Sequence, residues 1–237
     1  MRRRLLVIAG LTLLLGASST VAGPAAPTLP PDLPMAERSR LTAVATGASI
    51  ATRVEGEPFL ARREILEYLL DHLAFTTDVI RALRFGRLRI WPTPEGLLVD
   101  EGWGTTGRLS VAYAAGGTRV LYLRGQHKVA LLPAIRGDVL LTIDYQYVPA
   151  DPGRDLVKTT VAAYLKLDSR ILSAALSLGG PVARRKADRE ARDIVKLFAR
   201  VSRAVDADPA GVYAKLRDQP GIPRAELDEF RSLLAIR

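Results

Sequence analysis

The sequence predicts an α+β fold in which a curved antiparallel sheet of about seven strands packs against one long C-terminal helix. Three observations support this fold class. Residues 59–83 carry apolar side chains at helical spacing, residues 87–168 alternate between apolar and polar side chains, and residues 182–205 return to helical spacing. Alternating segments joined by short turns are typical of consecutive antiparallel hairpins. One face of such a sheet is apolar and needs a cover, which the last helix can provide.

The N-terminal residues predict an export signal and a linker. Residues 1–23 combine three arginines, an apolar run and small residues, as secretory signal peptides do. The apolar run is shorter than the roughly 20 residues that span a bilayer, although an uncleaved anchor is the alternative. Residues 24–40 are rich in proline, which favours an extended linker. We therefore expect an exported protein, periplasmic or secreted after signal-peptide cleavage.

One domain is expected over residues 41–206, beginning with a strand at Ala48–Val54 that ends before Pro58. Two helices follow over residues 59–85. The pattern between them is interrupted at residues 74–78 by β-branched threonines, so we expect a bend there.

Six strands are expected after the helices, because the apolar period changes to two. They cover residues 87–91, 96–104, 108–115, 118–132, 138–149 and 156–168. Alternation assigns an inner, apolar face to several of them. On residues 138–149 this face holds Val139, Leu141, Ile143, Tyr145 and Tyr147, and on residues 108–115 it holds Leu109, Val111 and Tyr113.

The long helix is predicted over Val182–Val205 with two opposite stripes. The apolar stripe contains Ala187, Ala191, Ile194, Phe198, Val201 and Val205. The basic stripe contains Arg185, Arg189, Arg192, Lys196, Arg200 and Arg203. Residues 207–237 form a helical extension, in which Asp208 is expected to cap a helix that begins at Pro209.

The order of these elements resembles the START-like superfamily, also called SRPBCC or helix-grip proteins. The resemblance covers roughly residues 45–205 and rests on the "EYLLDH" helix pair, the alternating strands and the long final helix, not on a catalytic signature. It implies a hydrophobic cavity between the sheet and the C-terminal helix that binds a lipid or another apolar ligand. The export signal and the helical tail after residue 206 depart from the superfamily pattern.

Composition excludes several kinds of site. The chain has no cysteine, which rules out disulfides, thiolate metal sites and a cysteine nucleophile. Its only histidines, His72 and His127, are too few for a multi-histidine metal site, so we expect neither a metal nor a cofactor. Without residues 1–23 the chain has 31 basic and 25 acidic residues, a net charge of +6. Outside the cytoplasm this charge favours anionic lipid over nucleic acid as a partner.

The predicted ligand-binding residues are those expected to face the cavity from the sheet and the long helix. They are Trp103, Tyr113, His127, Leu141, Ile143, Tyr145, Tyr147, Val161, Ile194 and Phe198. Tyrosines with apolar rings and polar tips suit a ligand with a small polar head, although ordinary core filling explains them equally well.

A polar pair on the same face suggests the alternative of a cavity enzyme. By alternation His127 shares the apolar face with Leu121 and Leu123, and Glu101 falls on a face with Trp103. A carboxylate beside an imidazole could act as an acid–base pair, but a structural histidine is the more ordinary interpretation. His72, within the helix pair, is expected at the surface or as a cap.

The sequence thus predicts an exported carrier of a lipid or other hydrophobic ligand, with a cavity mouth near residues 133–137 and 171–180. Two alternatives stay open. One is a cavity enzyme of the same superfamily, such as a cyclase or hydrolase, although no nucleophile elbow or phosphate-binding loop is present. The other is a structural envelope protein with a filled core, whose basic helix face contacts anionic membrane or a partner.

Overall fold

The computed structural model of the protein describes residues 26–128, 133–171, 173–174 and 180–236. The signal peptide predicted for residues 1–23 lies outside the described residues, and the predicted cavity mouth at residues 171–180 lies largely outside them. Within the described part of the chain, no helix is both long and apolar enough to cross a membrane.

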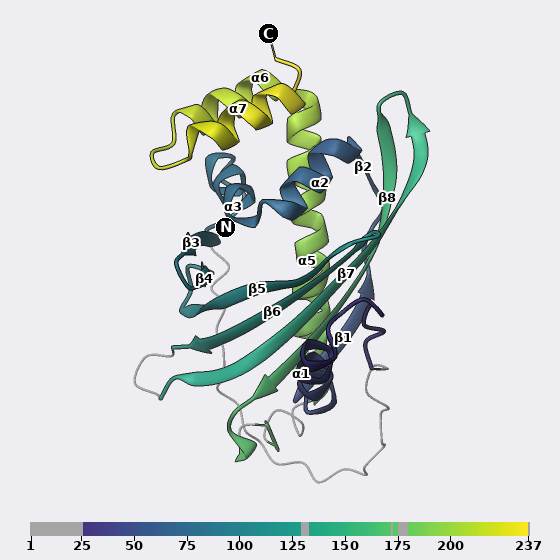
Figure 1. The fold of residues 1–237 in the computed structure, drawn as a ribbon, viewed down its shortest axis with the longest axis vertical. Helices are drawn as coiled ribbons and strands as arrows, with labels where there is room; N and C mark the ends of the chain where they lie inside the picture. Colours follow the sequence, from purple (N-terminus) through teal and green to yellow (C-terminus); the bar gives the residue numbers. More distant parts are fainter. Residues whose placement is uncertain (1–25, 129–132, 172, 175–179, 237) are drawn as a thin grey trace.

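The predicted α+β class is confirmed: a curved, open antiparallel sheet of eight strands packs against a long helix near the C-terminus (Figure 1). The strands are β1 (Ile50–Glu55), β2 (Phe59–Ala61), β3 (Arg89–Thr93), β4 (Gly96–Asp100), β5 (Thr105–Ala115), β6 (Thr118–His127), β7 (Ile135–Asp151) and β8 (Arg154–Leu167). Their order in the sheet is β1-β8-β7-β6-β5-β4-β3, and the short β2, which was not predicted, also pairs with β8. Pro92 is tolerated in β3 because that strand lies at the sheet edge.

The described helices are α1 (Met35–Thr46), α2 (Arg63–Asp71), α3 (Leu73–Ala82), α5 (Gly180–Ala207), α6 (Pro209–Arg217) and α7 (Arg224–Leu233). The predicted pair α2 and α3 is confirmed, but the bend lies at His72 rather than at residues 74–78. The threonines are helical because the Thr76 hydroxyl donates to the Leu69 carbonyl and the Thr77 hydroxyl donates to the Ala74 carbonyl. These bonds satisfy the buried hydroxyls without breaking the helix.

The prediction of an extended linker over residues 24–40 is wrong for its last part. The last proline of this segment is Pro34, and α1 begins directly after it at Met35. Leu41 and Val44 of this helix are buried against Leu140 and Tyr164 of the sheet. Packing of these apolar side chains on the sheet stabilises a helix whose own sequence has little amphipathic pattern.

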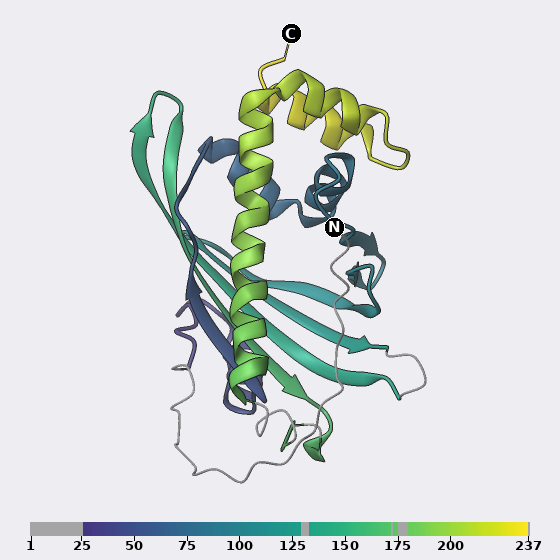
Figure 2. The ribbon, with the colours of Figure 1, turned by 180° about the vertical axis from the view of Figure 1, so that it is seen from behind.

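Two helices lie on opposite sides of the sheet. Figures 1 and 2 show α5 running along the concave side, where it contacts β1, β2 and β8, and α1 on the convex side. The predicted apolar stripe of α5 is confirmed: Ala191 is buried against Val54 and Val161 of the sheet, and Val201 is buried against the other helices. The Thr52 hydroxyl adds a hydrogen bond to the Asp188 carboxylate of α5.

A β-bulge between Val111 and Tyr113 places Tyr113 on the opposite face of the sheet from the one that was predicted. Up to Val111, which pairs with Leu121, β5 keeps its alternation. After the bulge Tyr113 pairs with Val120, whose side chain points to the convex side. Tyr113 therefore also points to that side, where it packs in the core beneath α1. Tyr113 is therefore not an inner-face residue, because one extra residue in a strand reverses the face of all that follow.

The C-terminal extension is part of the core and not an appendage. Its helices α6 and α7 pack against α2, α3 and the last turns of α5 (Figure 1). Phe230 of α7 is fully buried, with ring contacts to Phe75 and Tyr68. The predicted cap of α6 is confirmed, since the Asp208 carboxylate accepts a hydrogen bond of 2.8 Å from the Gly211 backbone N–H.

Candidate functional site

The concave face of the sheet carries an apolar grid beside α5. In this grid Leu109 pairs with Leu123, which pairs with Val139, and the next row joins Val111, Leu121 and Leu141. Registered neighbours in a sheet point to the same face, so the six side chains form one surface. Leu109 is buried, Val111 is 43% exposed, and the other four are half-buried. The grid therefore offers apolar side chains that the fold covers only in part.

Next to α5 the same face is filled. Ile143, Tyr145 and Val161 are buried, and the half-buried Ile194 and Phe198 of α5 pack against them. Most of the predicted site residues come together here: Leu141, Ile143, Tyr145, Tyr147, Val161, Ile194 and Phe198. The two tyrosines that could have lined a hole thus belong to a packed cluster at the α5 side of the concave face.

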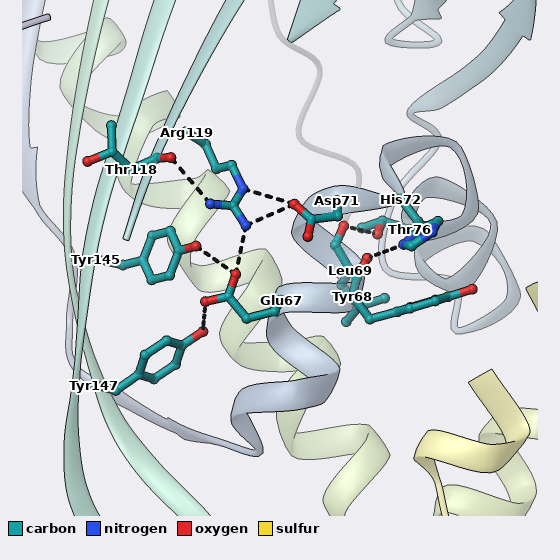
Figure 3. A network of polar contacts seen from close by, with 10 residues as sticks. All are labelled: Glu67, Tyr68, Leu69, Asp71, His72, Thr76, Thr118, Arg119, Tyr145 and Tyr147. Carbon is teal, nitrogen blue, oxygen red and sulfur yellow. Dashed lines mark hydrogen bonds and ion pairs between the residues drawn. The ribbon is translucent and has the colours of Figure 1, made fainter. Parts of the chain in front are cut away.

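The hydroxyls of these tyrosines meet at one carboxylate. Figure 3 shows Tyr145 and Tyr147 pointing from β7 toward Glu67 of α2. Tyr145 donates to Glu67 Oε2 at 2.8 Å, and Tyr147 donates to Glu67 Oε1 at 2.9 Å. Both oxygens of Glu67 are therefore occupied by donors from the sheet.

Arg119 completes this polar network from β6. Its guanidinium lies 2.7 Å from Glu67 and 2.8 Å from Asp71, and its side chain is only 6% exposed (Figure 3). One buried cation thus joins two carboxylates that lie one helical turn apart on α2. The network fixes α2 over the concave face and closes the end of that face nearest to the helices.

The network changes how its tyrosines ionise. Burial and the hydrogen bond to the Glu67 carboxylate raise the pKa of Tyr145 and of Tyr147 well above the ordinary value of 10.0. The folded protein therefore holds these protons more tightly than the unfolded chain does. The resulting stability is fully present below about pH 10 and is lost as the pH rises toward the folded-state pKa values.

We expect Tyr145 and Tyr147 to remain protonated at about pH 11, where a solvated tyrosine is largely ionised. Spectrophotometric titration of phenolate absorbance would measure this as a deficit among the seven tyrosines of the chain, to which Tyr68, Tyr122 and Tyr164 also contribute because burial raises the pKa of each. The share of Tyr145 and Tyr147 is the part of the deficit that is lost when both are replaced by phenylalanine. The deficit should vanish in denaturant. An unchanged deficit in the Tyr145→Phe/Tyr147→Phe variant would contradict the buried network.

Sequence reasoning missed Glu67, Asp71 and Arg119. One signal was present, because Arg119 is in phase with Leu121 and Leu123 on the apolar face of its strand. A charged residue at such a position requires a partner. Nothing in the local pattern of α2 shows that Glu67 supplies it, since the contact joins segments that are 52 residues apart.

The structure places the other predicted residues away from this cluster. Trp103, in the loop between β4 and β5, is 61% exposed and stacks beside Arg87. His127 is on the concave side by register, at the far end of β6. Its imidazole Nδ1 lies 2.9 Å from the Thr105 hydroxyl, which in turn donates to Glu101 at 2.6 Å.

His127 and Glu101 lie near each other, at a distance of 3.9 Å with Thr105 as a bridge, although the pair is not buried. Both side chains are partly exposed, and no group of three potential metal ligands occurs among the described residues. The cluster could transfer a proton to a molecule bound at that end of the sheet.

Comparison of the chain with protein-family models and with curated proteins found no match.

Proposed function

We propose that the protein binds a lipid or another hydrophobic ligand on the concave face of its sheet. The observation that carries this proposal is the half-exposed apolar grid between α5 and the β3–β4 edge. A soluble domain normally buries contiguous apolar side chains, and an apolar surface left partly open is typical of a binding site. The resemblance of the element order to START-like proteins supports the same function, and the signal-like residues 1–23 support an exported, periplasmic or secreted carrier.

The packed cluster supports one position on the face for such a ligand. Tyr145 and Val161 are already buried under α5, so they are neighbours of the ligand and not its main contacts. The ligand instead covers Val111, Leu121 and Leu141, where side chains are still in contact with solvent. Complete burial of an apolar side chain contributes about 1.5–3 kcal/mol, whereas micromolar affinity corresponds to about 8 kcal/mol beyond an association cost of about 4 kcal/mol or more. Such affinity therefore requires burial of the ligand's own apolar surface as well as that of the grid.

The test places a charge on the grid. Val111→Lys would put an ammonium group among apolar side chains, and we expect binding of an apolar fluorescent dye and of any co-purifying lipid to weaken at least about tenfold. Dye titration and native mass spectrometry of protein purified without detergent would measure both effects.

Ser110→Lys is the matched control, because Ser110 is an exposed neighbour on the same strand that points to the convex side. It should bind the dye and lipid as the parent protein does. Equal binding by both variants would contradict the proposal and favour a structural protein with a filled core.

A further inference from the structure

A second surface, at the C-terminal ends of α3 and α5, combines arginines with aromatic rings. Two hollows meet there at Phe85, between the loop that follows α3 and the C-terminal turns of α5. One, of about 560 Å³, is lined by Arg81, Arg84, Arg87 and Trp103. The other, of about 310 Å³, is lined by Arg200 and Arg203. We call the combined surface the arginine groove.

The charges of the arginine groove are largely unneutralised. Arg81 contacts Asp78 at 3.3 Å, but within the described chain Arg84, Arg87, Arg200 and Arg203 have no carboxylate at ion-pair distance. Arg87 and Arg200 instead lie over the rings of Trp103 and Phe85, at 4.7 and 4.1 Å. Four free guanidinium groups on one surface are complementary to an anionic partner.

The backbone holds this surface in place at some conformational cost. Arg84 has a φ of 57°, a left-handed conformation in which glycine is usual at a helix end. The Phe85 N–H donates back to the Ile80 carbonyl at 2.9 Å, which ends α3 and fixes Phe85 between the two hollows.

We propose that the arginine groove docks the protein on the surface of an anionic lipid bilayer, with Trp103 at the level of the headgroups. Arginines bind phosphate groups in a planar, bidentate manner, and an exposed tryptophan prefers the membrane–water interface. Arg200 and Arg203, the C-terminal end of the predicted basic stripe of α5, belong to this surface. The rest of the stripe is not the contact, because among the described residues only the groove brings unpaired arginines together with an exposed aromatic ring. The inference does not depend on ligand binding at the apolar grid.

The experiment uses the full protein after removal of its N-terminal signal and vesicles of phosphatidylcholine with or without phosphatidylglycerol. We expect binding only to the anionic vesicles at physiological salt, and weaker binding at high salt. The double variant Arg84→Glu/Arg87→Glu should bind at least about tenfold more weakly. The control Arg185→Glu/Arg189→Glu makes the same charge change on exposed residues of α5 outside the groove and should stay within about twofold of the parent.

A second variant excludes misfolding as the cause. Arg84→Gly removes one charge and relieves the left-handed backbone, so it should unfold at a temperature no lower than the parent protein while binding vesicles less tightly. In a Trp91→Phe background Trp103 is the sole tryptophan, and its emission should shift to the blue when anionic vesicles are added.

Three results would overturn the inference. Absence of vesicle binding would point to an acidic protein as the partner of the groove. Equally weak vesicle binding by the control variant Arg185→Glu/Arg189→Glu would show that the net charge of the protein alone causes the attraction. Complete competition by soluble glycerophosphate would identify a site for a single phosphate compound. The Val111→Lys variant should bind vesicles as the parent protein does. A result against ligand binding at the grid is therefore distinguishable from a result against membrane docking at the groove.

Discussion

The Phe230→Ala variant is expected to lose about 3–5 kcal/mol of unfolding free energy, the largest loss that we expect from a single substitution in this protein. Phe230 is fully buried, and its ring centroid lies 5.0 Å from that of Phe75 and 5.8 Å from that of Tyr68. Alanine would leave a cavity where α7 meets the helix pair, and it would also remove two aromatic contacts. Urea or thermal unfolding followed by circular dichroism would measure the loss.

Ser232→Ala is the control on the same helix, because Ser232 is exposed and alanine is a good helix former. It should change the unfolding free energy by less than about 0.5 kcal/mol. A loss of under about 1 kcal/mol for Phe230→Ala would show that the C-terminal extension unfolds separately from the sheet, contrary to the shared core.

The second large effect is expected at Glu67. Glu67→Ala removes the acceptor of two tyrosine hydroxyls and one of the two carboxylates that neutralise Arg119. The Arg119 side chain is 6% exposed and Tyr145 is 5% exposed, so both lose this partner where little water reaches them. We expect a loss of about 2–4 kcal/mol of unfolding free energy, measured by chemical denaturation.

Asp71→Ala is the matched variant, since Asp71 also contacts Arg119 but its side chain is 48% exposed. It should cost less than about 1 kcal/mol. In the double variant the losses of unfolding free energy caused by Glu67→Ala and by Tyr147→Phe should not add, because both substitutions remove the same hydrogen bond. Equal losses for Glu67→Ala and Asp71→Ala would contradict the central position of Glu67.

The spacing of apolar side chains predicted the fold correctly where the pattern extended over a whole strand or helix. The alternation in β7 correctly placed Ile143 and Tyr145 on the concave face, and the helical stripe correctly placed Ala191 of α5 against the sheet. A one-residue bulge has no comparable signature, so Tyr113 was assigned to the wrong side. Helix α1 was missed altogether because the prolines before it dominate the composition, whereas packing on the sheet stabilises that helix.

The candidate site was predictable in its apolar part and not in its polar part. Residues of one strand share a face by geometry, so Leu141 and Tyr147 could be grouped from sequence alone. The contact between Glu67 and Arg119 depends on how α2 is placed over β6, which no local pattern determines. For the same reason, the meeting of Arg84 with Arg203 around Phe85 was not foreseen.

The pairing of β1 with β8 also determines how this chain must fold. Ile50 pairs with Leu165, and Tyr68 of α2 contacts Phe230 of α7, so elements from opposite ends of the sequence complete the same layers. Chains dominated by such distant contacts fold slowly, because loop closure precedes the gain from packing. Until α7 emerges during synthesis, the apolar side of α2 and α3 stays uncovered. The nascent chain therefore needs protection from aggregation for nearly its whole length.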